Sequence, residues 1–337
     1  MKAAFWHGIK DIRVKEMNVP VAKDGEVLIE VKWCGICGSD LHEYSAGPIT
    51  IPVGEPHPLT GDKAPLILGH EFAGTVVELS KGATNVKVGD RVAIEPILYC
   101  GACEPCKQGL YNLCKLRGFH GIVGNGGGFA QYTAIQSRMV HKIPDEMSFE
   151  EGATIEPAAV AVQAVKKSQI KIGDTCIVFG AGPIGLIIIQ AAKAAGAVSV
   201  IAVEVSESRI GKATEAGADH VINPSKEQVL SAIMEITDGK GADICYEVSG
   251  AESAFIQAIN AVKPSGEVMI VSLWEKPISI NLNQLVLKEC KINSSVGYSH
   301  IFPEVIALIS SGQINTKSLI TAMQLTQLCH LFDPPLP

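Results

Sequence analysis

A regular alternation of apolar strands and helical stretches over residues 155–295 constrains the fold of this chain more than any other feature. Apolar runs such as TCIVFG and VSVIAVE alternate with helical stretches such as PIGLIIIQAAKAAG. Strands that are apolar on both faces and separated by helices form parallel sheets that helices cover on each side. The sequence therefore predicts a doubly wound α/β domain over residues 155–295.

The turn after the first of these strands carries the pattern G-x-G-x-x-G, with Gly180, Gly182 and Gly185. The first glycine permits a tight turn, the second leaves room for a pyrophosphate, and the third lets helix and strand pack closely. Nineteen residues after Gly185, Glu204 ends the next strand, where a carboxylate accepts hydrogen bonds from ribose hydroxyls and repels a 2′-phosphate. The pattern predicts NAD binding rather than NADP binding. Further cofactor-binding candidates are Pro183, Ile184 and Arg209.

The first part of the chain has a different pattern. Residues 1–150 are rich in glycine and contain short alternating runs such as EVLIEVKW and AGTVVEL. Alternation of apolar and polar residues is typical of strands with one buried face, so a small barrel or sandwich is predicted here. The last forty residues contain one helical pattern, FPEVIALISSG, and end in CHLFDPPLP, where prolines exclude regular structure.

Composition narrows the class of protein. The 337 residues are 47% hydrophobic and 19% charged, which is the balance of a soluble globular protein large enough for two domains. A formal charge of -7 offers no basic face, so nucleic acid is not an expected partner. The sequence shows no signal peptide and no run long enough to span a bilayer, which predicts a cytoplasmic protein without a membrane partner. Because disulfides are rare in the cytosol, ten cysteines point to metal binding or to chemistry.

Four cysteines, Cys100, Cys103, Cys106 and Cys114, lie in the run YCGACEPCKQGLYNLC. Their spacing lets four thiolates converge tetrahedrally on one zinc ion, which makes a closed structural site. An iron–sulfur cluster also takes four cysteines, but the ferredoxin pattern places the fourth closer and follows it with proline, whereas Lys115 follows Cys114. Zinc is favoured, with a cluster, a redox pair or unligated cysteines as the alternatives.

Two other segments contain candidate ligands for a second metal. Cys37 in CGICGSDLH and His70 in LGHEFAG offer a sulfur and a nitrogen, and Glu71 or Glu156 adds an oxygen. Three protein ligands and an open position are the pattern of catalytic zinc. On the residues alone, a His-Glu pair is more often a satisfied polar pair, and Cys34 with Cys37 also resembles a redox C-x-x-C.

Taken together, these motifs resemble those of one known family. The chain carries, in order, CGICGSDLH, GHEFAGTVVELS, the four-cysteine run and GAGPIG. In this it resembles the zinc-containing medium-chain alcohol dehydrogenases over nearly its whole length, up to about residue 325. Within that superfamily, EPHPLTGDKAPLILGHEFAG and GIVGNGGGFAQY look most like the 2,3-butanediol dehydrogenases, which interconvert acetoin and butanediol.

The resemblance implies a fold and a second metal site. It implies a GroES-like catalytic domain over residues 1–154 and 296–337 and a Rossmann domain over residues 155–295. It also implies that Cys37, His70 and Glu156 hold a catalytic zinc, with Glu71 as an adjacent carboxylate able to exchange with water as a ligand. Two zinc ions per chain are therefore expected, one catalytic and one structural.

Other residues receive roles from the same matching. Ser39 and His42 resemble the relay that carries the alcohol proton to solvent, and Asp40 resembles a carboxylate that orients a zinc-bound histidine. The remaining cysteines match no ligand position and are interpreted as bystanders, small hydrophobic residues or surface thiols: Cys34, Cys176, Cys245, Cys290 and Cys329.

The implied reaction passes hydride from a secondary alcohol or vicinal diol to NAD, while zinc lowers the pKa of the substrate hydroxyl. A sorbitol-type polyol dehydrogenase is the alternative, but such enzymes commonly place arginine before the tyrosine of SVGYSH, where this chain has Gly297. Threonine dehydrogenases share the scaffold. From another class, a non-catalytic zinc-stabilised protein remains an alternative. A homodimer or homotetramer is expected.

The end of the chain departs from the family pattern. Members usually finish with a further helix and a strand that returns to the catalytic domain, whereas this chain runs from LTQL into CHLFDPPLP. A frameshift or a truncation would look like this. An unpaired edge in the catalytic domain would then be expected to weaken stability or assembly.

Overall fold

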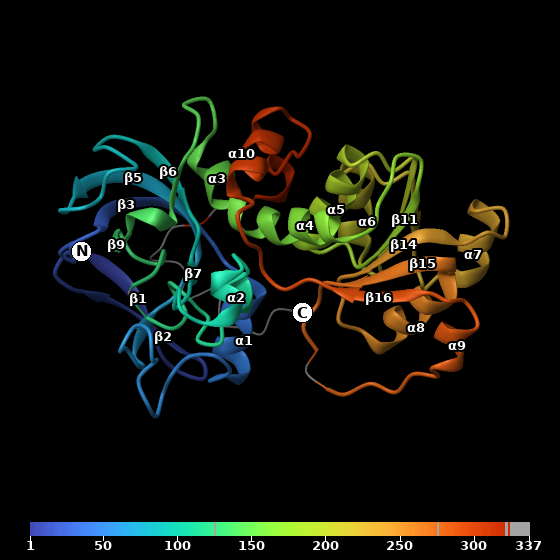
Figure 1. The fold of residues 1–337 in the computed structure, drawn as a ribbon, viewed down its shortest axis with the longest axis horizontal. Coiled ribbons are helices and arrows are strands. Elements are labelled where there is room, and N and C mark those ends of the chain that lie inside the picture. The colour runs from blue at the N-terminus through green and yellow to red at the C-terminus, as the bar shows by residue number, and fades with distance from the viewer. Residues whose placement is uncertain (125, 275, 321–322, 324–337) are drawn as a thin grey trace. The chain divides into compact units, whose positions relative to one another are not determined.

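A computed structural model describes residues 1–124, 126–274, 276–320 and 323 (Figure 1). Its contacts divide the chain into two compact units. Of the described residues, unit 1 holds Met1–Glu156 together with Ile320 and Met323, and unit 2 holds Pro157–Leu319. The boundary between them lies two residues beyond the one expected at 154. Residues 296–319, which were expected in the first domain, make their contacts in unit 2, and the functional domain assignment stays a prediction.

Unit 1 is built from short antiparallel strands. One sheet has the order β2-β1-β4, a second has the order β10-β6-β5-β3-β9, and a third pairs β7 with β8. The strands are β1 (Lys2–Gly8), β2 (Asp11–Glu16), β3 (Glu26–Gly35), β4 (Leu66–Ile67), β5 (Glu71–Leu79), β6 (Arg91–Ile94), β7 (Ile97–Leu98), β8 (Gly118–Phe119), β9 (Tyr132–Gln136) and β10 (Val140–Lys142). This arrangement confirms the β-rich fold that the alternating runs predict.

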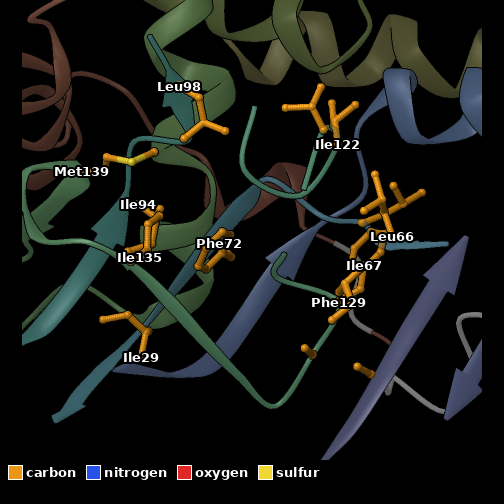
Figure 2. Close-up of a cluster of buried hydrophobic side chains, with 14 of the residues drawn as sticks. Ile29, Leu66, Ile67, Phe72, Ile94, Leu98, Ile122, Phe129, Ile135 and Met139 are labelled. Atoms are coloured by element: carbon orange, nitrogen blue, oxygen red, sulfur yellow. The ribbon is translucent and has the colours of Figure 1, made fainter. Parts of the chain in front are cut away.

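The core of unit 1 is a cluster of buried aliphatic and aromatic side chains. Figure 2 shows part of it, with Phe72 from β5, Ile94 from β6 and Ile135 from β9. All three are at most 2% exposed, and each such side chain contributes about 1.5–3 kcal/mol when it leaves water. Because β5 begins at Glu71, directly after His70, this packing holds the candidate metal ligands on a rigid strand.

Short helices connect these strands. They are α1 (Gly38–Ala46), α2 (Glu104–Lys107), η1 (Tyr111–Leu113), η2 (Ser137–Met139) and α3 (Phe149–Ala153). Helix α3 starts with a capping box, in which Ser148 accepts from the amide of Glu151 and the Glu151 carboxylate accepts from the amide of Ser148. The next helix, α4 (Ile155–Lys167), carries Glu156 in its first turn.

Unit 2 is a six-stranded parallel sheet in the order β13-β12-β11-β14-β15-β16. The strands are β11 (Thr175–Phe179), β12 (Ser199–Val203), β13 (His220–Ile222), β14 (Ala242–Glu247), β15 (Val262–Ile270) and β16 (Lys291–Ser294). The order reverses between β11 and β14, which makes this edge the switch point of a doubly wound sheet. The predicted doubly wound α/β fold is confirmed.

Helices flank this sheet, with α5 and α6 on one side and α8 and α9 on the other (Figure 1). The helices that follow α4 are α5 (Pro183–Ala194), α6 (Glu207–Glu215), α7 (Val229–Ile236), α8 (Glu252–Ala261), α9 (Asn283–Val286), α10 (Phe302–Ser310) and η3 (Lys317–Leu319). Helix α10 confirms the helix predicted in FPEVIALISSG, whereas CHLFDPPLP, with Cys329, lies outside the described residues. Within the described part of the chain, no helix is both long enough and apolar enough to cross a membrane.

Candidate zinc and cofactor sites

The four-cysteine run folds into a lobe in which the thiols converge. The Sγ atoms of Cys100, Cys103, Cys106 and Cys114 all lie within 4.8 Å of one another. Cys103 and Cys106 are 3.4 Å apart, Cys114 and Cys100 are 3.5 Å apart, and Cys100 and Cys106 are 4.0 Å apart. Zinc–sulfur bonds of about 2.3 Å in a tetrahedron place sulfur atoms about 3.8 Å apart, so the lobe fits one zinc ion.

Backbone amides of the lobe point at the sulfur atoms. Cys100 Sγ lies 3.5 Å from the amide nitrogen of Ala102 and 3.4 Å from that of Cys103, and Cys114 Sγ accepts from Leu116 at 3.4 Å. The amides of Lys115 and Cys106 lower the pKa of Cys103 to about 6. Because zinc binds the thiolate and not the thiol, these amides favour the form that a metal needs. All nine described cysteines, these four included, are free thiols, which argues against a disulfide framework.

Aromatic and polar side chains hold the lobe against the rest of unit 1. The rings of Tyr99 and Tyr111 stack at 4.7 Å, and the Arg138 guanidinium lies 4.2 Å above the Tyr99 ring. The Tyr111 hydroxyl donates to the buried carboxylate of Glu95, which also lies 2.8 Å from Nε2 of His141. These contacts anchor the lobe to Glu95 next to β6, to Arg138 in η2 and to His141 in β10.

The second candidate set also comes together in the fold. One ligand atom each from Cys37, His70 and Glu71 lies within 4.8 Å of the others. Cys37 precedes α1, while His70 and Glu71 sit at the start of β5, which pairs with the end of β3. One sulfur, one nitrogen and one oxygen on two packed elements form a donor set that suits zinc.

Asp40 connects two of these ligands. One of its oxygens accepts from the amide of Cys37 at 2.9 Å, and its Oδ1 lies 3.6 Å from Nδ1 of His70. Asp40 Oδ1 and His70 Nδ1 are both buried, and neither has a hydrogen-bond partner among the residues that the structure describes. With Nδ1 turned toward Asp40, Nε2 is the ring atom available to a metal, which is how a carboxylate orients a metal-binding histidine.

The charges at this site favour a cation. Burial, and after it the nearby Glu156 carboxylate, raise the pKa of Glu71 to about 8. Burial also raises the pKa of the Cys37 thiol, with the Glu71 charge adding to the effect. Burial lowers the pKa of His70, but the facing Asp40 charge outweighs it and the net pKa is raised well above the usual value. The raised pKa values of Glu71 and Cys37 show that burial and neighbouring acids disfavour their anionic forms, and a bound divalent ion would offset this cost.

The other predicted residues lie near this set in different ways. Ser39 Oγ is 3.5 Å from Nε2 of His70, and His42, three residues further along α1, is exposed to solvent. Glu156 is 4% exposed and acts on the charge of Glu71, but it is not in the group whose ligand atoms lie within 4.8 Å. Cys34 lies beside Gly69 and Gly128 and is outside the ligand group. The assignment of Glu156 as a ligand stays a prediction.

The glycine turn in unit 2 has the form that the sequence predicts. Gly180 has φ +100°, in the left-handed region that favours glycine. A Cβ on Gly185 would lie 2.0 Å from the Gly180 carbonyl oxygen, so only glycine lets α5 pack this closely on β11. At Gly182 a Cβ would meet nothing within 4 Å, which leaves open space at the helix N-terminus for a phosphate.

The side chain of Glu204 lies next to this turn. Its carboxylate is 5% exposed and accepts from the amides of Ala181 at 2.7 Å and of Val205 and Ser206 at 2.9 Å each. Pro183 and Ile184 form the first turn of α5, and Arg209 is exposed on α6. A dinucleotide fits this edge because the turn, the open helix end and the acid lie together.

Two family models match the chain. Residues 23–145 match the alcohol dehydrogenase GroES-like domain, and residues 183–311 match the zinc-binding dehydrogenase domain. The chain is 49% identical to (R,R)-butanediol dehydrogenase of Bacillus subtilis over 322 residues, which cover 95% of this chain and 91% of that protein. It belongs to the zinc-dependent medium-chain alcohol dehydrogenases.

Further similarities agree with this family assignment. The crystal structure of 2R,3R-butanediol dehydrogenase from Bacillus subtilis matches with a TM-score of 0.93 and 47% identity, covering 98% of this chain and 94% of that one. Sorbitol dehydrogenase of Bacillus subtilis is 38% identical over 95% of this chain and 89% of its own length. This alcohol dehydrogenase therefore has a GroES-like domain and a Rossmann domain, and it uses zinc and a nicotinamide cofactor on a small-molecule substrate.

The structure also reveals residues of this alcohol dehydrogenase that sequence reasoning missed. The Phe119 ring packs on His70 with centroids 5.8 Å apart, which fixes one side of the imidazole. Nothing in the sequence signals this contact, because β8 is only two residues long. Glu247 ends β14 as Glu204 follows β12, and this repetition of a buried acid after an apolar strand was a readable signal.

Proposed function

We propose that this alcohol dehydrogenase oxidises vicinal diols, in the first place 2,3-butanediol, to the corresponding acyloin with NAD, and catalyses the reverse reduction. The observation that carries the proposal is 49% identity to a butanediol dehydrogenase across 95% of the chain. Sorbitol is the second candidate, supported by 38% identity to sorbitol dehydrogenase. Against it stands Gly297, which occupies the position before Tyr298 where polyol dehydrogenases commonly carry arginine.

The residues of unit 1 are assigned as follows. Cys37, His70 and either Glu71 or Glu156 would hold a catalytic zinc, which when bound acts as a Lewis acid on the substrate hydroxyl. Asp40 holds His70 in the orientation that presents Nε2. The convergence of these side chains, of which His70 and Glu71 are buried, supports a catalytic protein over a purely structural one.

Proton transfer falls to α1. Ser39 lies within 3.5 Å of Nε2 of His70, and His42 is on the same face of the helix because it follows Ser39 by three residues. Exposure of His42 suits a group that exchanges a proton with water. We assign Ser39 and His42 as the relay that carries the alcohol proton to solvent.

The cofactor assignment rests on unit 2. Gly180, Gly182 and Gly185 shape the turn for a pyrophosphate, and the buried carboxylate of Glu204 next to that turn disfavours a 2′-phosphate. We infer NAD as the preferred cofactor and a second, structural zinc in the cysteine lobe. A cytoplasmic homodimer or homotetramer without nucleic-acid or membrane partners completes the proposal.

The test is a screen with purified enzyme that follows NADH absorbance. Stereoisomers of 2,3-butanediol, sorbitol, threonine and simple alcohols are compared, each with NAD and with NADP. We expect kcat/KM to be highest for a butanediol isomer and about ten-fold or more higher with NAD than with NADP. A higher kcat/KM for sorbitol would make sorbitol, and not 2,3-butanediol, the proposed substrate. Equal use of both cofactors would contradict the role of Glu204 in excluding NADP. Turnover of none of these compounds would favour a non-catalytic protein.

A further inference from the structure

A second buried carboxylate lies at the carboxyl edge of the parallel sheet in unit 2. Glu247, the last residue of β14, is 0% exposed. Its Oε1 accepts from the amides of Ser249 at 2.9 Å and Gly250 at 3.0 Å and from the Ser249 hydroxyl at 2.6 Å. Its Oε2 accepts from the Ser272 hydroxyl. A group that accepts four hydrogen bonds and donates none behaves as an ionised carboxylate.

This carboxylate joins three segments at the switch point. Ser249 and Gly250 follow β14, and Ser272 follows β15, so Glu247 ties the two turns together. Ser249 in turn lies against the first glycine of the dinucleotide turn, since a Cβ on Gly180 would be 3.2–3.3 Å from its atoms. The backbone also connects the turn after β14 to β11, because the amide of Val248 donates a hydrogen bond to the carbonyl of Phe179 at 3.0 Å.

The charge of Glu247 has no cationic partner in the described part of the chain. None of the ion pairs there includes it. Its negative charge is spread only over amides and hydroxyls, which leave the net charge in place. A buried net charge acts over several ångströms because little water screens it.

The half of the sheet that contains Glu247 is the nicotinamide half. In a doubly wound sheet each half binds one nucleotide, and the acid after the second strand faces the adenosine ribose. That acid is Glu204 after β12, so β11, β12 and β13 take the adenosine part. The strands β14, β15 and β16 are left for the nicotinamide part, and Glu247 ends the strand closest to the switch point.

We propose that Glu247 is a positioning residue of the cofactor site that also favours the oxidised cofactor. Its hydrogen bonds hold the turns after β14 and β15, and its negative charge stabilises the positively charged ring of NAD⁺ more than the neutral ring of NADH. The inference rests on the nicotinamide cofactor of the proposed function. It adds a residue that sets the relative affinity for the two redox forms.

The test measures dissociation constants of the full-length, zinc-loaded enzyme for NADH by fluorescence and for NAD⁺ by competition. In Glu247→Gln the charge is lost, and the ratio Kd(NAD⁺)/Kd(NADH) should rise about three- to ten-fold. Ser272→Ala keeps the charge and removes one hydrogen bond, so it should weaken both forms equally and leave the ratio unchanged. An unchanged ratio in Glu247→Gln, or a changed ratio in Ser272→Ala, overturns the proposal.

The matched control is Glu267→Gln. Glu267 is also buried, at 3% exposure, and accepts from the amide of Gln169 at 2.7 Å and from Asn293 at 3.0 Å. It pairs with Ile244, three residues before Glu247 on β14, which places it roughly 10 Å from the carboxyl edge. The ratio should stay at the wild-type value in this control, and a rise as large as in Glu247→Gln would contradict a local effect.

Two further results keep the test decisive. Glu247→Asp keeps the charge and shortens the side chain, so it should bind both forms more weakly at the wild-type ratio, even where Glu247→Gln does not fold. A shifted ratio in Glu247→Asp would overturn the proposal. Wild-type enzyme that binds neither NAD⁺ nor NADH would refute the cofactor assignment itself. Wild-type enzyme that binds both, with no shift in Glu247→Gln, refutes only the role of Glu247.

Discussion

Three buried carboxylates and one buried histidine determine which ion the candidate catalytic site can hold. Asp40, Glu71 and Glu156 are 0%, 8% and 4% exposed, and one histidine, His70, lies with them. Buried carboxylates repel one another, which is why proximity to Glu156 adds to burial in raising the pKa of Glu71. The residues are therefore held in an arrangement that a divalent ion stabilises, and removing one ligand affects the whole set.

The first prediction separates chemistry from cofactor binding. His70→Ala should abolish turnover, because it removes the only nitrogen from the set of Cys37, His70 and Glu71. NADH affinity, measured by fluorescence titration, should persist because the glycine turn belongs to unit 2. Turnover at near the wild-type rate would show that the metal is held elsewhere.

The relay can be tested through pH. His42→Ala should lower kcat roughly 10- to 100-fold at neutral pH, toward the lower end of general acid–base effects. The loss should shrink at high pH, where solvent hydroxide replaces the imidazole. Steady-state rates measured between about pH 6 and about pH 10 test the effect. A loss of equal size at every pH would indicate a packing role for this side chain.

A buried histidine outside the ligand set gives a stability prediction. Burial lowers the pKa of His120 to about 3, and its Nε2 lies 2.9 Å from the Thr133 hydroxyl. The unfolded chain binds a proton near pH 6.5 while the folded chain does not, so stability should fall as pH drops below that value. This one group should contribute about 1.4 kcal/mol per pH unit between pH 6.5 and about pH 3. Urea unfolding should show a shallower pH slope for His120→Gln, and equal slopes would contradict a neutral buried imidazole.

Among the elements, the cysteine lobe has little secondary structure of its own. Helix α2 has four residues and η1 has three, which is too short for either to be stable alone. The converging thiols and the Tyr99–Tyr111 stack supply the order that hydrogen-bonded helices supply elsewhere. The lobe should therefore depend on its metal for structure.

Cys103→Ser should lower the free energy of unfolding by several kcal/mol, on the scale of structural zinc binding. The fraction that folds should keep activity, since Cys37, His70 and Glu71 are a separate ligand group. Thermal unfolding and activity per folded molecule measure the two effects. An unchanged free energy of unfolding in Cys103→Ser would contradict a structural role for metal binding in the lobe.

How far the sequence predicts these elements depends on the range of the contacts involved. The strand, glycine turn and helix around Gly180 are local, and the structure confirms them. The meeting of Cys37 with His70 needed the family resemblance, because it arises from the pairing of β3 with β5. The position of Glu247 at the end of an apolar strand was readable, but the contact of Phe119 with His70 and the hydrogen bond from Ser272 to Glu247 join distant segments and leave no local pattern.

For the whole molecule, we expect the cysteine lobe and the Cys37 group to release their metal ions at different rates. Elemental analysis should find about two zinc ions per chain, one that a chelator removes quickly and one that it removes slowly. An open three-ligand site releases its ion more readily than a closed shell of four thiolates. Activity should disappear with the fast ion and return when zinc is added. A content of one zinc, or of iron, would contradict the assignment.

The cysteine lobe has all four ligands within fifteen consecutive residues, from Cys100 to Cys114. During translation this ligand group is complete as soon as residue 114 has left the ribosome, before any strand of unit 2 is made. Cys37, His70 and Glu71 leave the ribosome earlier, but their group depends on the long-range pairing of β3 with β5, in a sheet whose last strand, β10, ends at Lys142. Synthesis under zinc limitation would then fill the lobe first and yield folded, inactive chains that a later supply of zinc activates.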